Sequence, residues 1–396
     1  MIARRIKKEL SHFVALPETA KLLTLSYFLR SIAYPLMSIF TGAFIWQTSN
    51  DIVLLILYHL GNFIILPVMF VANAKLLRII SLRRLYAAGV MFSGLGPLLV
   101  IFQRSETPLM YLLYGILYGI GNGLYWANRN YLTVRQTTTT TRSYFTGLQF
   151  TLAIIASMVI PPIAGWIVIA LSFGYQLLAI LAVVFLLGAG FSLKHGMFKT
   201  PVFSGIKKHP SSVWNKARWL SVAIGCVDSA IYILPTVLIL KLTGNEAILG
   251  LVSGIASGLS GCASYVVGRK YRQPMFSLMF PIAIAGFILS GVPMLWGISI
   301  VSVSWYLLIA NLSDSVIWIV NEPVIMDMID DEVKRSGTSY QRLIAEREGF
   351  LNIGRIAVTL PFLAIAMINQ TLALETIAVL CGAISLIIAI SSRSTT

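Results

Sequence analysis

Two short stretches of the chain, Leu29 to Tyr34 (LRSIAY) and Val227 to Tyr232 (VDSAIY), carry the same pattern with opposite charges. Arg30 is the charged residue of the first stretch, and Asp228 is its counterpart half of the 396 residues later. Each stretch lies in the first long apolar segment of its half of the sequence. An ionisable side chain is costly inside a bilayer and marks a functional site by default. The matching positions therefore predict a site where two duplicated halves meet.

The composition is that of a polytopic membrane protein. Hydrophobic residues make up 57% of the chain and charged residues 11%, whereas soluble proteins carry about 25% charged residues. The mean hydropathy is +0.82, and a helical span needs about 20 apolar residues. We predict an all-α protein with twelve transmembrane helices, at residues 22–46, 51–73, 85–103, 108–128, 144–169, 173–193, 218–240, 246–267, 274–294, 297–322, 349–368 and 371–391.

The distribution of basic residues predicts the orientation and the domain boundaries. If the N-terminus is cytoplasmic, nearly all loop lysines and arginines are cytoplasmic too, and only Arg104 and Lys241 lie on the opposite side. This asymmetry follows the positive-inside rule and explains the net charge of +15 without a nucleic-acid partner. We predict a six-helix bundle over 1–194, a cytoplasmic linker over 195–217 and a second six-helix bundle over 218–396. The protein is expected in the cytoplasmic (inner) membrane, with both termini in the cytoplasm.

The repeat extends beyond the first pair of stretches. Residues 122–130 of the fourth span align with residues 314–322 of the tenth, which places Asn122 on Asp314 and Trp126 on Trp318. The start of the fifth span, residues 142–145, aligns in the same way with residues 347–350 of the eleventh. Three matches in the same order indicate two related halves.

Parallel repeats of six spans are the architecture of the major facilitator superfamily, which this chain resembles over its whole length. Residues 119–123 (GIGNG) look like the glycine-rich stretch of its fourth span, and Pro161 and Gly165 match its antiporter element in part. The loop at 72–84 keeps the superfamily's basic cluster but lacks its acidic partner. The string at 125–130, together with Arg347-Glu348, Asn352 and Arg355, resembles a poorly characterised bacterial branch of transporters. The resemblance implies alternating access between two bundles.

Arg30 lies about eight residues, or ~12 Å, inside its predicted span. It either reaches back to the membrane surface with its long side chain, or presents a planar donor fork to a carboxylate or phosphate. Asp228 is too short to reach the surface. It either forms a fixed structural bridge with Arg30, or opens from that partner and takes up a proton. Asp314 is a second proton-coupling candidate.

Other polar residues inside the spans are candidates for solute binding or for packing between helices. His59 either relays protons or is hydrogen-bonded to a neighbour. The predicted substrate-binding residues are Arg30, Tyr34, His59, Asn62, Asn122, Trp126, Gln149, Asp228, Tyr232, Asp314 and Trp318. A cytoplasmic gate is predicted from Arg129, Arg142, Glu322, Asp327 and Arg347, although the acidic run at 327–332 can also be read as a solvated loop.

No phosphate loop, metal motif or nucleophile elbow occurs in the sequence, and Cys226, Cys262 and Cys381 all lie in apolar segments. We therefore predict a monomeric secondary transporter, not an enzyme, that needs no cofactor or metal. It would move an anionic, zwitterionic or amphiphilic small molecule, with the proton as coupling ion. One alternative is efflux or flipping of lipophilic compounds, for which a lateral apolar opening would be the sign. Another is a non-transporting receptor or assembly factor, with a permanently closed Arg30–Asp228 bridge.

Overall fold

The computed structural model describes residues 13–14, 16–103, 107–135, 139–194 and 211–391, and the side chains of 133–143 lie outside this description. The helices of the first half are α2 (Glu18–Ser49), α3 (Ile52–Leu76), α4 (Leu82–Phe92), α5 (Leu95–Gln103), α6 (Pro108–Arg135), α7 (Thr139–Ala170) and α8 (Gly174–Phe191). Those of the second half are α9 (Ser212–Thr243), α10 (Glu246–Lys270), α11 (Phe276–Gly291), α12 (Ile300–Ser336), α13 (Tyr340–Ile368) and α14 (Gln370–Ser391). The short 3-10 segments η1 (Gln273–Met275) and η2 (Val292–Trp296) flank α11.

Every predicted span contains a helix, which confirms the all-α membrane fold. The third span is divided into α4 and α5 at Ser93 and Gly94. The tenth continues as α12 to Ser336, where Gly337 adopts a left-handed conformation and ends it. The acidic run at 327–332 is therefore helical, and its reading as a loop was wrong. Long charged side chains do not stop a helix, whereas a residue with positive φ does.

Eleven of the described helical segments are long and apolar enough to cross a membrane, with α4 and α5 counted as one. The predicted fourth span, α6, is not among them. Its sequence includes Asn122, Asn128 and Arg129, which lower its hydropathy. Polar residues in a membrane protein face the interior of the bundle or a cavity. With its polar residues, α6 is thus expected to line a site.

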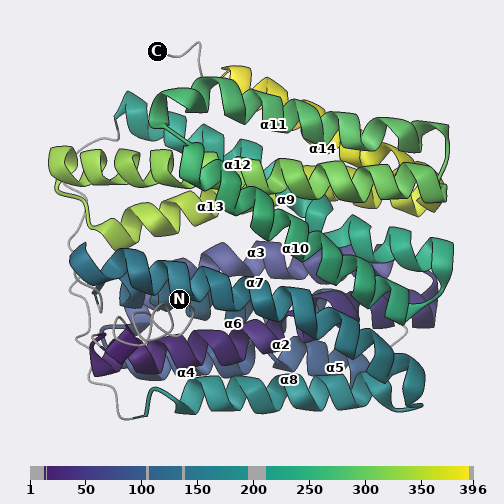
Figure 1. Ribbon diagram of the computed structural model, residues 1–396, viewed down its shortest axis with the longest axis horizontal. Helices are drawn as coiled ribbons and strands as arrows, with labels where there is room; N and C mark the ends of the chain where they lie inside the picture. Colours follow the sequence, from purple (N-terminus) through teal and green to yellow (C-terminus); the bar gives the residue numbers. More distant parts are fainter. Residues whose placement is uncertain (1–12, 15, 104–106, 136–138, 195–210, 392–396) are drawn as a thin grey trace, which may run out of the picture.

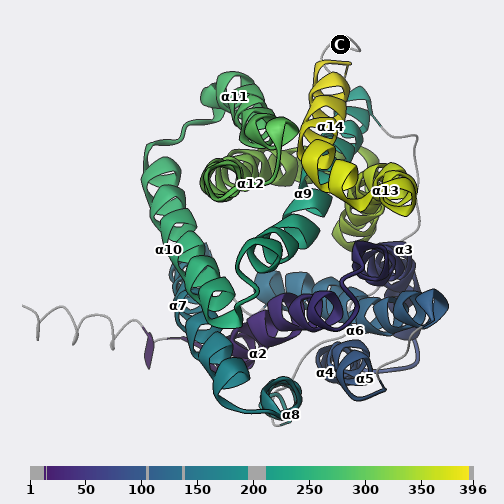
Figure 2. The ribbon, with the colours of Figure 1, turned by 90° about the vertical axis from the view of Figure 1, so that its right-hand side faces the viewer.

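The helices run roughly parallel in two groups (Figure 1). We call the end at which α2 and α9 begin the linker end, and the opposite end the far end. Within the first group α2 packs on α7 and α8, and α6 packs on α3 and α4. Within the second, α9 packs on α13 and α14, and α11 packs on α12. The groups meet where α7 contacts α10, α3 contacts α13, and α2 contacts α9, as the view along the helices shows (Figure 2).

Glycines allow α6 to approach its neighbour α3 at backbone distance. A Cβ atom built at Gly115 would overlap the backbone carbonyl of Tyr58, and one built at Gly119 would lie 2.9 Å from Cα of Asn62. Small residues spaced four apart form such close helix contacts in membranes, where packing replaces the hydrophobic driving force. This contact fixes Asn62 and Asn122 on adjoining helices.

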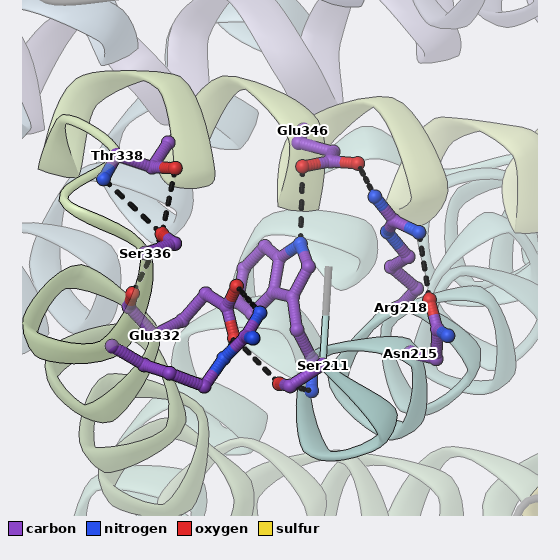
Figure 3. A network of polar contacts seen from close by, with 9 residues as sticks. Ser211, Asn215, Arg218, Glu332, Ser336, Thr338 and Glu346 are labelled. Carbon is purple, nitrogen blue, oxygen red and sulfur yellow. Dashed lines mark hydrogen bonds and ion pairs between the residues drawn. The ribbon is translucent and has the colours of Figure 1, made fainter. Parts of the chain in front are cut away.

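A polar network ties α9, α12 and α13 together at the linker end (Figure 3). Ser211 donates a hydrogen bond to Glu332 at 2.5 Å, and the indole of Trp214 donates one to Glu346 at 3.0 Å. Arg218 forms an ion pair with Glu346. The start of α9 lies within the predicted linker of 195–217, so residues 212–217 are helical and anchored to the second bundle.

Candidate functional site

Arg30 is buried on α2 and is held by aromatic rings and an amide. Its Nη2 donates a hydrogen bond to Oδ1 of Asn122 at 3.0 Å. Its Cζ lies 3.7 Å from the ring centroid of Tyr125 and 5.6 Å from those of Tyr34 and Trp126. These distances fit cation–π contacts. Arg30 therefore does not reach back to the membrane surface, and its Nε has no hydrogen-bond partner among the described residues.

Amide side chains continue from Arg30 toward α3. The Nδ2 of Asn122 donates to Oδ1 of Asn62 at 3.4 Å. Gln149 is buried on α7, and its Nε2 has no partner in the described chain. The structure thus places Arg30, Asn62, Asn122 and Trp126 together within the first bundle.

Asp228 forms its ion pair with Arg355 of α13. Its Oδ2 lies 2.7 Å from Nε and 2.5 Å from Nη2 of Arg355, whose Nη1 donates to Asn352 at 3.1 Å. Both charged residues are about 95% buried. Asp228 is therefore satisfied by a partner from its own bundle.

The predicted Arg30–Asp228 bridge is wrong, and the helix packing explains why. A Cβ atom at Gly225 would overlap the carbonyl of Leu351, and one at Gly354 would overlap that of Val222. These glycines bring α9 and α13 into backbone contact one turn from Asp228 and beside Arg355. Arg30 belongs to the other bundle, and its guanidinium faces Tyr125 and Asn122 instead.

An aromatic layer separates the two charged centres. The ring of Tyr34 of α2 lies 5.6 Å from Cζ of Arg30, and the ring of Tyr232 of α9 lies 5.5 Å from Cζ of Arg355. The ring of Tyr232 also lies 6.0 Å from His59 and 5.9 Å from Phe63 of α3. The Cζ of Arg355 lies 5.4 Å from the Phe63 ring. Arg30 and Asp228 therefore face one region where the bundles meet, but they are not paired.

His59 is buried, and its Nδ1 has no hydrogen-bond partner among the described residues. It packs edge-on against Tyr58 with ring centroids 5.5 Å apart. The two readings of His59, as a proton relay or as hydrogen-bonded to a neighbour, both stay predictions, and Nδ1 makes no such bond among the described residues. The environment is that of a histidine held by ring packing.

Asp314 lies half-buried on α12, next to the Asp228–Arg355 pair. It is in electrostatic contact with Trp318, Asp228 and Arg355. No ion pair between described residues involves Asp314. Two carboxyl groups thus lie near one guanidinium, which compensates one of them.

The predicted gate residues make contacts within their own bundles. Glu322 pairs with Arg347, whose Nη1 lies 3.2 Å from Oε1 of Glu322. Arg129 packs over the rings of Trp126 and Tyr27, 4.8 and 5.2 Å away. Asp327 is exposed, and the side chain of Arg142 lies outside the described residues. A gate that joins the bundles at this end stays a prediction.

Polar contacts between the bundles occur at the far end. Gln370 at the start of α14 donates to Oδ1 of Asp51 at 2.9 Å and accepts from the backbone N–H of Ile52 at 3.2 Å. Tyr175 of α8 donates to Glu246 of α10 at 2.9 Å. The glycines of α10 approach α7 from the same end, since a Cβ at Gly250 would overlap the carbonyl of Pro161.

Sequence reasoning missed Arg355 and Tyr125 as members of the site. Arg355 lies inside the predicted span 349–368, so the argument that singled out Arg30 applied to it equally. Tyr125 carried no comparable signal, because an aromatic residue in a span is usually packing. Its role depends on the rotation of α6 relative to α2.

The family follows from comparison with known proteins. The family model of the Major Facilitator Superfamily matches residues 22–342, and the chain belongs to this superfamily. It is thus a multi-pass membrane protein of a transporter family.

Two relatives of uncharacterised function match the sequence. The chain is 25% identical to "Uncharacterized protein YqgE" of Bacillus subtilis (strain 168) over 348 residues, which cover 85% of this chain and 80% of that protein. It is 28% identical to "Uncharacterized protein in sodM 3'region" of Geobacillus stearothermophilus over 141 residues, or 36% of this chain and 66% of the relative.

Solved structures of transporters share the fold. A bacterial homolog of the human lysosomal transporter Spinster, in an inward-facing and occupied conformation, superposes with a TM-score of 0.67 at 11% identity, covering 95% of each chain. The nucleoside transporter NupG superposes with a TM-score of 0.67 at 14% identity, covering 96% of this chain and 99% of that one.

Proposed function

We propose that this protein is a monomeric secondary transporter of the cytoplasmic membrane, with both termini inside, that moves a small organic solute by alternating access. The observation that carries the proposal is that Arg30 of one bundle and the Asp228–Arg355 pair of the other lie on either side of aromatic rings in mid-span. Arg30 lies 5.6 Å from the Tyr34 ring and Arg355 lies 5.5 Å from the Tyr232 ring, which packs on His59 across the bundles. A solute bound there would contact both bundles. Its binding would differ between the two arrangements of the bundles, as coupling requires.

The far-end contacts support an arrangement that is closed at the far end. Gln370 and Tyr175 link the bundles there. With the linker end cytoplasmic, this arrangement corresponds to an inward-facing transporter. In the outward-facing arrangement the far-end contacts would break, and Arg129, Arg142, Glu322, Asp327 and Arg347 would close the linker end.

Spin labels on opposite ends test alternating access directly. Phe102 and Ile300 are exposed near the far end, and Ile79 and Lys334 are exposed near the linker end. The exposed Cys262 is first replaced by serine, and the two residues of each pair are replaced by cysteine and spin-labelled. The distance between the two labels of a pair is then measured by double electron–electron resonance at acid and alkaline pH. We expect the two separations to change in opposite directions. A rigid molecule at both ends would exclude transport and favour the receptor alternative.

We further propose that the proton is the coupling ion and that Asp228 and Asp314 carry it. Asp228 is paired with Arg355, whereas Asp314 is in none of the ion pairs between described residues. Repulsion between two nearby carboxylates favours a proton on one of them. Movement of Arg355 relative to Asp228 would then change which carboxyl group holds the proton.

Reconstituted protein with a pH-sensitive dye inside the vesicles tests proton coupling. The solute is first chosen by thermal-shift screening against metabolite and drug panels. Wild-type protein should then acidify or alkalinise the lumen when the solute is added, whereas Asp228→Asn and Asp314→Asn should lose this signal. Full proton-coupled accumulation by both variants would remove these residues from the mechanism.

Efflux or flipping of lipophilic compounds is a second candidate, favoured by one apolar groove. The groove has a volume of about 340 Å³ and lies between α9, α10 and α12. Its lining is mostly aliphatic, with Asn311 among its few polar residues. Bulky substitution at Ala256 in this groove should block transport of a lipophilic substrate and leave transport of a polar solute unchanged.

A further inference from the structure

Arg30 differs from the two other buried arginines of the described residues in having no carboxylate partner. Arg347 and Arg355, which are 5% and 6% exposed, each pair with a carboxylate. Arg30 is 5% exposed, and none of the ion pairs between described residues involves it. A buried charge without a counter-charge is strongly unfavourable. Its cation–π contacts replace only part of the lost hydration, so the position favours an anion brought by a ligand.

The guanidinium is oriented and still has an unused donor. Its face is covered by Tyr125 at 3.7 Å, and its Nη2 is held by Asn122. Its Nε–H is buried and has no partner in the described chain. A planar fork that is fixed on one side and free along an edge matches the geometry of a carboxylate or phosphate, which accepts such bonds in pairs.

A second unused donor lies on the adjacent helix. Tyr27 of α2 and Phe145 of α7 are in ring contact at 6.4 Å, and both helices start at the linker end. Arg30 follows Tyr27 by three residues and Gln149 follows Phe145 by four, so each occupies the next turn of its helix. The amide Nε2 of Gln149 is also buried without a partner. The Gln149 amide is a neutral donor on the helix that packs against α2, and a donor at this level adds to the attraction for an anion.

We propose that Arg30 and Gln149 form an anion-binding subsite for the carboxylate or phosphate group of an organic solute. The inference rests on the proposed transport function and narrows its substrate class from anionic, zwitterionic or amphiphilic solutes to organic anions. The half-buried rings of Tyr34 and Tyr232 lie on the side of the Asp228–Arg355 pair. They would contact the apolar body of the same solute.

Matched probes test the charge requirement on purified full-length protein. Phenylacetate, phenyl phosphate, 2-phenylethanol and 2-phenylethylamine share a ring and differ in charge. We expect both anions to bind at least about tenfold more tightly in isothermal titration calorimetry than the neutral and cationic probes, because charge-assisted hydrogen bonds are the strong ones. Whichever of phenylacetate and phenyl phosphate binds more tightly shows whether the subsite prefers a carboxylate or a phosphate. Equal binding of all four probes overturns the proposal.

Variants locate the binding to the proposed atoms. Arg30→Gln should weaken anion binding by about tenfold or more, and Gln149→Leu by about threefold. Arg30→Lys keeps the charge without the fork and should fall between wild type and Arg30→Gln. The control is Arg78→Gln, because Arg78 is exposed in the turn after α3. Anion affinity that is unchanged in both Arg30→Gln and Gln149→Leu places the subsite elsewhere.

The binding test is independent of transport. Wild-type protein that binds phenylacetate through Arg30 but shows no opposite movement of its spin-labelled ends keeps the anion subsite and loses the transporter proposal. Protein that moves and transports a solute, but binds anions no better than 2-phenylethanol, keeps the transporter and loses the subsite. The thermal unfolding midpoint of each variant shows whether it is folded.

Discussion

Asp228 and Arg355 are opposite charges buried together, and each costs far more alone than paired. Arg355→Gln leaves the Asp228 carboxylate without its partner, so we expect it to lower the free energy of unfolding by about 3–5 kcal/mol. Adding Asp228→Asn should recover most of the loss, because two neutral amides remain. Unfolding in detergent, analysed as a double-mutant cycle, measures this coupling. Additive effects of the two substitutions would contradict the pairing.

The same residues show what a sequence can tell about a membrane site. The cost of a buried charge predicts that Arg30 and Asp228 lie inside the protein, and the structure buries both. This cost does not predict the partners of the two charges, because Asn122 and Arg355 are brought near them by helix rotation and glycine contacts. Arg355 was detectable by the argument used for Arg30. Tyr125 depends on three-dimensional packing that hydropathy does not record.

Helix contacts, more than hydropathy, set the geometry of the second bundle. Gly225 and Gly354 bring α9 and α13 together, and any Cβ atom there overlaps a backbone carbonyl. We expect Gly354→Ala to lower the free energy of unfolding by about 1–3 kcal/mol, because the helices must separate. The separation would also lengthen the Asp228–Arg355 contact. Thermal unfolding of the purified protein measures the effect.

Gly349 is the matched control on the same helix. Apart from its chain neighbours and its own helix backbone, no heavy atom of the described residues lies within 4 Å of a Cβ atom built there. Gly349→Ala should therefore leave stability unchanged or raise it by about 0.5–1 kcal/mol, because alanine restricts the unfolded chain more than glycine does. Similar losses in Gly349→Ala and Gly354→Ala would show that close packing at Gly354 is not the cause.

Helix boundaries show a second limit of sequence reasoning. The apolar run of the tenth span ends near Glu322, but α12 continues to Ser336. Hydropathy reports where the membrane ends, whereas a helix ends where its backbone hydrogen bonding stops. The extension carries Glu332 to the network with Ser211 and Arg335, so a segment outside the apolar run becomes part of a rigid bundle.

The balance between the two arrangements of the whole molecule depends on contacts that exist in only one of them. Gln370 bonds both Asp51 and the backbone N–H of Ile52 across the far end. A hydrogen bond contributes about 1 kcal/mol net, so Gln370→Ala should shift the equilibrium toward a far-end-open arrangement by about fivefold or more. The spin-labelled pair at Phe102 and Ile300 would report a larger population at the longer distance.

Thr376→Val is the matched control on α14, because the one bond of the Thr376 hydroxyl to the described residues goes to the carbonyl of Leu372 in its own helix, at 2.8 Å. It removes a hydrogen bond of similar strength without touching the other bundle, so the distance distribution should stay that of the parent. The pair at Ile79 and Lys334 should shorten in Gln370→Ala as the far end opens, since two rigid bundles that separate at one end approach at the other. A far end that opens without this shortening would mean that the bundles bend individually and do not rock as units.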